Sequence, residues 1–221
     1  MPPDAAVYLF KSCLVIVTAL FPIVNPLGTT PIFLSLTPGY STESRSILSR
    51  KIALNSFWLL TGSMLIGGHI LNFFGISIPV VQVGGGLVVM STGWTLLKTA
   101  GAEARQNPEK RITGRDITNR AFYPLTLPLT VGPGSISVAI TLGANETLYH
   151  SIPLRLLAAV IGPALMALTI YLSYRSAERL AKILGETSMN VVVRLTAFIL
   201  LCIGVQITWN GVHALMQEAS R

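Results

Sequence analysis

A proline-rich stretch inside a long apolar segment constrains this chain more than any other feature. Residues 21–36 read FPIVNPLGTTPIFLSL and contain Pro22, Pro26 and Pro31. Proline removes a backbone donor and clashes with the preceding helical turn, so these three residues predict a broken helix. In hydrocarbon, a broken helix is tolerated only where protein or a water-filled cavity satisfies the freed backbone groups. The stretch therefore predicts a deliberately interrupted transmembrane helix.

The same proline spacing recurs 102 residues further along the chain. Residues 124–140 read PLTLPLTVGPGSISVAI and contain Pro124, Pro128 and Pro133. Two interrupted hydrophobic segments at matching places in two halves are typical of the binding site of a secondary transporter. The alternative is that the small and hydroxylated residues of these stretches only pack helices closely.

The composition indicates a membrane protein without a soluble domain. Of the 221 residues, 51% are hydrophobic and 11% are charged, whereas soluble domains carry about 25% charged residues. The net charge of +7 comes from basic residues in the links between apolar spans, so it predicts topology rather than nucleic-acid binding. Cys13 and Cys202 lie within apolar segments and suggest neither a disulfide nor a metal site.

Six spans of about twenty residues can be drawn along the chain. The first runs from residue 5 into the broken stretch, and the others cover 52–71, 80–97, the second broken stretch from 121, 154–174 and 189–216. We therefore expect an all-α polytopic bundle of six transmembrane helices in a single domain, 1–221, with breaks in spans one and four. Repeat one (1–97) and repeat two (121–221) are joined by a hydrophilic link, 98–120. Three spans per half is an odd number, so the two repeats should have inverted topology.

The basic residues predict the orientation of the chain. Most of them lie in the links that follow spans one, three and five: Arg45, Arg50, Lys51, Lys98, Arg105, Lys110, Arg111, Arg115, Arg120, Arg175, Arg179 and Lys182. Basic links face the cytoplasm. Both termini should therefore lie outside the cytoplasm.

The broken segments offer the chemistry of a small zwitterion. Backbone N–H groups at the start of a half-helix attract a carboxylate, and Gly28, Gly132 and Gly134 let a ligand approach the backbone. Neutral donors and acceptors for an ammonium group are Asn25, Thr29, Thr30, Thr126, Thr130 and Ser135.

Soluble-enzyme signatures are absent from the sequence. It contains no HExxH, no GxxxxGK[ST] and no G-x-S-x-G motif, so we expect no enzyme and no cofactor or metal. No Asp or Glu lies in the middle of a span. Arg194 lies a few residues into span six, where it either reaches the cytoplasmic interface or acts near the substrate.

Four motifs resemble those of the MarC family of six-span membrane proteins, also called the neutral amino acid transporter or SnatA-like family. They are FPIVNPLGTTPIF, FGISIPVVQVGGGLVV, FYPLTLPLTVGPGSI and RLTAFILLCIGVQITWNG, and the resemblance covers nearly the whole chain. It implies a transporter of small neutral amino acids such as glycine and alanine in the cytoplasmic (inner) membrane of a bacterium or archaeon, coupled to a gradient of H⁺ or Na⁺.

The resemblance also implies which residues line the substrate site. These are Asn25, Pro26, Leu27 and Gly28 in the first motif and residues 128–133 in the second. The chain departs from the family in one place, since Gln82 stands where many members carry an arginine and Arg194 holds the matching place in span six. Both are therefore candidate coupling or gating residues. The alternatives are an exporter of another small polar metabolite or drug, a passive channel, or a membrane protein without transport activity.

Overall fold

The computed structural model describes residues 5–99, 120–145 and 151–219, and this part of the chain is helical without strands. The elements are α1 (Ala5–Val24), α2 (Pro26–Leu36), α3 (Thr42–Phe73), α4 (Ile78–Thr99), η1 (Ala121–Thr130), α6 (Pro133–Ala144), α7 (Ile152–Arg175) and α8 (Ala177–Ala219). All but the ends of the predicted link 98–120 lie outside the described residues. The prediction of an all-helical protein is confirmed.

Within the described residues, five helical segments are long and apolar enough to cross a membrane, and a sixth is reached if the bent pair η1 and α6 counts as one span. The axes of η1 and α6 meet at 69°. Residues 5–34 form one candidate span across the first break, and Asn190–Ala219 is the spanning part of α8. Before this part, α8 contains a kink at Gly185, whose φ is +71°.

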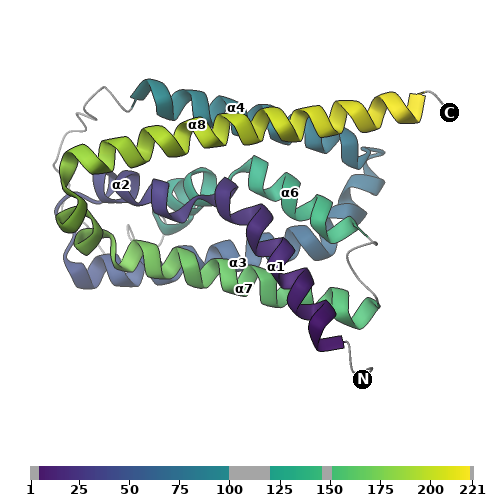
Figure 1. The fold of residues 1–221 in the computed structure, drawn as a ribbon. Helices are drawn as coiled ribbons and strands as arrows, with labels where there is room; N and C mark the ends of the chain where they lie inside the picture. The colour runs from purple at the N-terminus through teal and green to yellow at the C-terminus, as the bar shows by residue number, and fades with distance from the viewer. Residues whose placement is uncertain (1–4, 100–119, 146–150, 220–221) are drawn as a thin grey trace.

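The helices form three layers, with the broken segments in the middle (Figure 1). On one side α4 packs along α8, and on the other α3 packs along α7. The buried core includes Ile16 and Leu20 of α1, Leu60 of α3, and Met166 and Ile170 of α7. The start of α1 and the end of α8 lie at the same end of the bundle (Figure 1). This arrangement places both helix breaks between the α4–α8 pair and the α3–α7 pair.

Glycines bring α4 and α8 into backbone contact. A Cβ added at Gly86 of α4 would lie 2.8 Å from the carbonyl oxygen of Gly204 in α8, and one added at Gly204 would lie 2.8 Å from that of Gly86. Further along, a Cβ at Gly93 would meet Ala197 O at 2.8 Å and one at Gly211 would meet Pro79 O at 2.7 Å. No larger side chain fits there, so small residues hold this pair together as in other membrane helix pairs.

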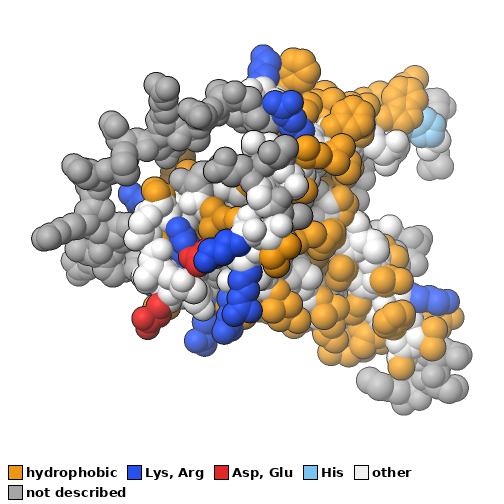
Figure 2. All heavy atoms as spheres, turned by 60° about the vertical axis from the view of Figure 1, so that its left-hand side comes forward, with side chains coloured by type: hydrophobic (Ala, Val, Ile, Leu, Met, Phe, Trp, Pro, Cys, Tyr) orange, Lys and Arg blue, Asp and Glu red, His pale blue; other side chains and the backbone are white. Residues whose placement is uncertain are grey.

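The outer surface is rich in large apolar side chains. Phe10, Phe73 and Trp58 are 69%, 84% and 64% exposed, which is expected of side chains that face lipid rather than water. Figure 2 shows Lys and Arg side chains gathered at the end of the bundle that carries the starts of α3 and α8, beside this hydrophobic surface. The chain thus has the polarity of a multi-pass membrane protein.

Candidate functional site

The first broken segment is interrupted at Asn25, between α1 and α2. Asn25 has left-handed backbone angles (φ 50°, ψ 58°), which asparagine adopts more readily than most residues. Its side chain caps α2, because the Gly28 N–H donates to Asn25 Oδ1 at 3.1 Å. Pro26 occupies the first turn of α2, where a missing N–H costs no hydrogen bond. Pro22 and Pro31 lie inside helices, so of the three prolines only Pro26 adjoins the interruption.

The second broken segment is interrupted more severely. Tyr123 (φ −126°, ψ 125°) and Leu127 (φ −106°, ψ 127°) have extended backbones inside η1, because a following proline disfavours the helical region. The chain then leaves η1 at Thr130 and turns by 69° into α6. Gly132 is the N-cap of α6 and has no side chain to cap it. The start of α6 is therefore open, meaning that no side chain caps its first N–H groups, whereas the start of α2 is closed by the side chain of Asn25.

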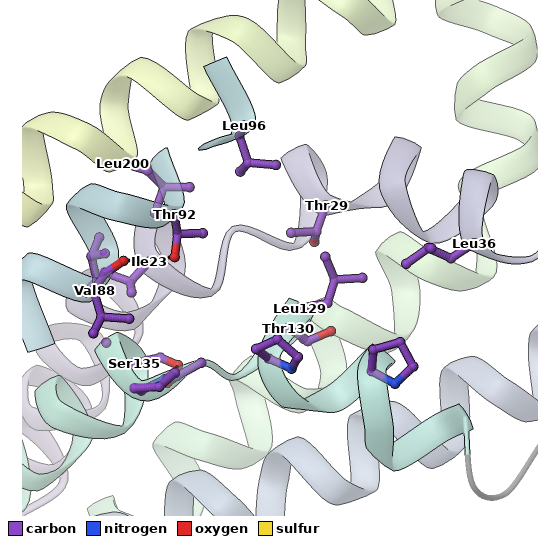
Figure 3. A pocket seen from close by; sticks show the side chains of 16 residues that line it. Ile23, Thr29, Leu36, Val88, Thr92, Leu96, Leu129, Thr130, Ser135 and Leu200 are labelled. Carbon is purple, nitrogen blue, oxygen red and sulfur yellow. Dashed lines mark hydrogen bonds between the residues drawn. The ribbon is translucent and has the colours of Figure 1, made fainter. Parts of the chain in front are cut away.

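A cavity of about 590 Å³ lies between the two broken segments and the α4–α8 pair. Figure 3 shows Thr29 of α2 and Thr130 of η1 on facing walls, with Leu129 between them. Most of the wall is apolar. The lining residues are Ile23, Thr29, Leu36, Val88, Val89, Thr92, Leu96, Pro124, Pro128, Leu129, Thr130, Gly132, Pro133, Gly134, Ser135 and Leu200. A largely apolar cavity of this size with a few polar groups is typical of a small-molecule site.

The start of α6 supplies one polar end of the cavity. Gly134 and Ser135 are in its first turn and line the cavity. The first N–H groups of a helix have no partner within the helix. The Ser135 hydroxyl donates to Gly132 O at 2.9 Å, so it leaves the backbone N–H groups uncapped. This end of the cavity has the polarity that favours an anion.

The second polar part of the cavity wall is formed by Thr29 and Thr130. A tyrosine hydroxyl connects these two residues and so joins the two broken segments. Tyr174 of α7 donates to Thr29 Oγ1 at 2.9 Å, and its hydroxyl lies 2.8 Å from Thr130 Oγ1. Its ring stacks on Phe33 of α2, with ring centroids 4.6 Å apart. Tyr174 is 1% exposed, so its position is fixed by packing as well as by hydrogen bonds.

The structure divides the predicted site residues into two groups. Thr29, Thr130, Gly132, Gly134 and Ser135 line the cavity, whereas Asn25, Pro26, Leu27, Gly28, Thr30 and Thr126 do not. The second group has local roles: the Thr30 hydroxyl donates to Pro26 O at 2.8 Å, and the Thr126 hydroxyl donates to Ala121 O at 2.6 Å. Leu27 is 48% exposed.

The two candidate coupling residues lie away from the cavity wall. Gln82 is half-buried on α4, Arg194 is exposed on α8, and neither lines the cavity. Sequence reasoning missed Tyr174 and the α4 wall, which consists of Val88, Val89, Thr92 and Leu96. The glycine run at 84–86 was the only signal near that wall, and nothing in the sequence distinguished Tyr174 from a tyrosine at a membrane interface.

A charged cluster fixes the far end of the first broken segment. Thr37 caps the end of α2, and Arg45 of α3 donates to its carbonyl oxygen at 2.7 Å and to its hydroxyl at 3.2 Å. Arg45 also pairs with Glu178 at the start of α8, which accepts from the Thr42 hydroxyl at 3.1 Å. The hydrogen bonds from Arg45 and Thr42 lower the pKa of the Glu178 carboxyl. The cluster joins α2, α3 and α8.

Comparison with known proteins identifies relatives in bacteria and archaea. The sequence profile of a family described as "MarC family integral membrane protein" matches residues 10–216. The "UPF0056 inner membrane protein MarC" of Citrobacter koseri is 30% identical over 213 residues, which is 92% of this chain and 95% of the relative. The "UPF0056 membrane protein YhcE" of Escherichia coli strain K12 is 31% identical over 196 residues, 89% of both chains.

An archaeal relative shows a similar degree of likeness. The "UPF0056 membrane protein" of Archaeoglobus fulgidus is 31% identical over 195 residues, which is 88% of this chain and 89% of the relative. No solved structure matches the chain.

Among the described residues, no group of three or more His, Cys, Asp or Glu side chains could hold a metal ion.

Proposed function

Because this chain belongs to the MarC family of integral membrane proteins, we propose that it is a secondary transporter of small neutral amino acids such as glycine and alanine. Transport would be coupled to a gradient of H⁺ or Na⁺ across the cytoplasmic membrane, with both termini outside the cytoplasm. The family and the multi-pass topology are the premise. The substrate and the coupling are the proposal.

One observation carries the proposal: the cavity has two polar parts of different character between the broken segments. The open start of α6 suits a carboxylate, because unpartnered N–H groups and the helix dipole favour negative charge. Thr29 and Thr130 present hydroxyl oxygens that can accept from an ammonium group. None of the lining residues is charged, so a zwitterion fits better than a substrate with a net charge.

The apolar walls of the cavity favour contact with an apolar side chain of the zwitterion. Val88 and Leu96 of α4 and Leu200 of α8 line the cavity. An apolar side chain on the substrate would gain free energy by contact with these residues, at about 25 cal/mol per Å² of apolar surface removed from water. Neutral aliphatic amino acids combine this property with the two charged groups.

The antiparallel packing of α4 along α8 fits an inverted repeat. Gly86 and Gly204 face each other, and Gly93 contacts Ala197 as Gly211 contacts Pro79. The residue numbers of each contacting pair sum to 290, so the two helices run antiparallel, as an inverted repeat requires of spans three and six. An alignment of the same spans by sequence gives an offset of 111 to 112, which places Gln82 near Arg194.

Counterflow in proteoliposomes tests the proposal. We expect unlabelled alanine inside the vesicles to drive saturable uptake of labelled glycine or alanine, and an imposed H⁺ or Na⁺ gradient to cause accumulation. The gradient that causes accumulation identifies the coupling ion. Flux that does not saturate would indicate a passive channel. The absence of counterflow with both substrates would contradict the proposal and favour another small polar metabolite, a drug or a role outside transport.

A matched pair of threonine variants links the activity to the cavity. Thr130 lines the cavity, whereas Thr141 of α6 donates to Ser137 O at 3.0 Å and does not line it. Thr130→Val should weaken counterflow and Thr141→Val should retain it. Equal activity of the two variants would place the substrate site elsewhere.

A further inference from the structure

The hydroxyl cluster formed by Thr29, Tyr174 and Thr130 has more close contacts than protons. Thr29 Oγ1 lies 2.9 Å from Asn25 O, and Thr130 Oγ1 lies 2.6 Å from Leu125 O. The Tyr174 hydroxyl lies 2.9 Å from Thr29 Oγ1 and 2.8 Å from Thr130 Oγ1. These four contacts contain three hydroxyl protons, because carbonyl oxygens only accept. One of the four contacts must therefore join two oxygen atoms with no proton between them.

The missing proton makes the cluster less stable, because the cluster is shielded from water that could supply a further hydrogen bond. Thr29, Thr130 and Tyr174 are 4%, 2% and 1% exposed. Oxygen lone pairs that face each other in such surroundings repel, and a polar network with an incomplete set of protons is less stable than a complete one. A longer contact, 3.4 Å from Thr29 Oγ1 to Pro26 O, offers another acceptor and no further proton.

A ligand that compensates for the missing proton could reach the cluster from the cavity. Both threonines line the cavity, and they lie on facing walls (Figure 3). A cation beside both threonines would be coordinated by the hydroxyl oxygens of Thr29 and Thr130, so that oxygen lone pairs without a proton would face a positive charge. No carboxylate is among the lining residues, so neutral oxygens would meet the charge.

We propose that the Thr29–Tyr174–Thr130 cluster is the cation subsite of the transport cavity, with Tyr174 as the residue that positions the two threonine oxygens. The subsite accepts a small monovalent cation that hydroxyl oxygens can bind, which is either the substrate's ammonium group or a sodium ion. This inference rests on the proposed function for its biological role. Because the two threonines come from the two broken segments, occupation of the subsite also ties these segments together.

The test uses the thermal unfolding of the purified full-length protein in detergent. Methylammonium chloride and sodium chloride are compared with tetramethylammonium chloride at equal ionic strength, because tetramethylammonium has no N–H donor and is too bulky for the subsite. A ligand that binds the folded state raises the unfolding midpoint in a saturable way. We expect methylammonium, sodium or both to raise the midpoint of the wild type above that in tetramethylammonium.

The decisive variant is Tyr174→Phe, which keeps the ring that stacks on Phe33. It also leaves each threonine with one proton and its backbone acceptor, so it should fold. We expect its half-saturating cation concentration to rise about tenfold or more. Tyr171→Phe is the matched control, since Tyr171 lies one turn earlier on α7 and its hydroxyl accepts from Arg175. Thr29→Val provides a second test within the cluster.

The outcomes separate this inference from the proposed function. Stabilisation by methylammonium alone assigns the subsite to the substrate's ammonium group, and stabilisation by sodium alone assigns it to the coupling ion. Equal midpoints of the wild type in all three salts, or equal responses of Tyr174→Phe and the wild type, would overturn the subsite even if alanine counterflow succeeds. A cation response that depends on Tyr174 would uphold the subsite even if counterflow fails.

Discussion

The two broken segments share their proline spacing and differ in almost everything that follows from it. The first is closed by its own residues: Asn25 caps α2, and Gly28 lies beneath the cap. The second turns by 69° and begins α6 at Gly132 without a side-chain cap, in the wall of the cavity. The start of α2 is therefore closed by a side-chain cap, whereas the start of α6 has no side-chain cap and lies in the cavity wall.

The difference originates at the residue that precedes the middle proline. In the first segment this residue is Asn25, and in the second it is Leu127. Asparagine tolerates the left-handed region and can cap a helix with its side chain. Leucine can do neither, so the restriction imposed by the following proline leaves Leu127 extended. The middle proline therefore begins α2 in the first segment but lies inside η1 in the second, where the open helix start comes at Gly132, before the third proline.

Valine substitutions at the two glycines should give the largest contrast. Gly132 has an extended backbone (φ −90°, ψ 176°), and the nearest atom to an added Cβ is Pro128 O at 3.1 Å. Valine adopts such angles readily, and the Pro128 carbonyl must shift by only a few tenths of an ångström to admit the Cβ, so the yield of folded Gly132→Val is measured alongside its activity. We expect counterflow to fall about 100-fold or more, equivalent to about 2.7 kcal/mol, because the side chain fills the open start of α6. Counterflow per folded molecule measures the effect.

The same change at Gly28 should act on folding instead. An added Cβ there would collide with the Asn25 side chain and lie 2.6 Å from Thr196 Cγ2. We expect Gly28→Val to lower the yield of folded protein in size-exclusion chromatography. Gly62→Val is the control, since no atom lies within 4 Å of its added Cβ. Loss of transport with a full yield of folded protein in Gly28→Val would show that the first break also binds substrate.

Substitutions of Asn25 should separate the cap from the backbone conformation. Asn25→Ala loses the hydrogen bond to Gly28 N–H and places alanine at φ 50°. We expect it to lower the free energy of unfolding by about 2–3 kcal/mol. Asn25→Gly loses the same hydrogen bond but adopts these angles freely, so it should cost only about a few tenths of a kcal/mol. Thermal unfolding in detergent ranks the variants, and equal losses would mean that the angles at residue 25 matter little.

The sequence predicted the existence of both breaks, because proline acts locally and its effect does not depend on tertiary contacts. It also predicted eleven substrate-binding residues; five of them line the cavity and six do not, and whether any of them binds substrate stays a prediction. It could not predict the α4 wall or Tyr174, since these depend on which helices pack together. Gly28 and Gly132 are the same residue type in similar motifs, and only the packing around them distinguishes a buried contact from an open wall.

The smallest effect should come from the charged cluster at the far end of the first segment. Arg45 holds the last carbonyl of α2 through Thr37 and pairs with Glu178, which is 30% exposed. Glu178→Gln keeps the size of the side chain and removes its charge. Because an ion pair this exposed contributes little, we expect the unfolding midpoint to fall by about 1–3 °C at pH 7. Glu43→Gln, in the first turn of α3, controls for the loss of an acidic charge.

The pH dependence of this effect distinguishes the ion pair from a loss of packing. The pKa of Glu178 is lowered from its ordinary value of 4.5 by hydrogen bonds from Arg45 and Thr42. A lowered pKa in the folded state contributes stability that is fully present above the unfolded-state pKa and is lost as pH falls through the folded-state pKa. The wild type and Glu178→Gln should therefore differ at pH 7 and converge only below pH 4.5. A difference that persists in strong acid would mean that Glu178 stabilises the end of α2 by contact alone, so that the first segment would be fixed by packing at this end and by a cap at the other.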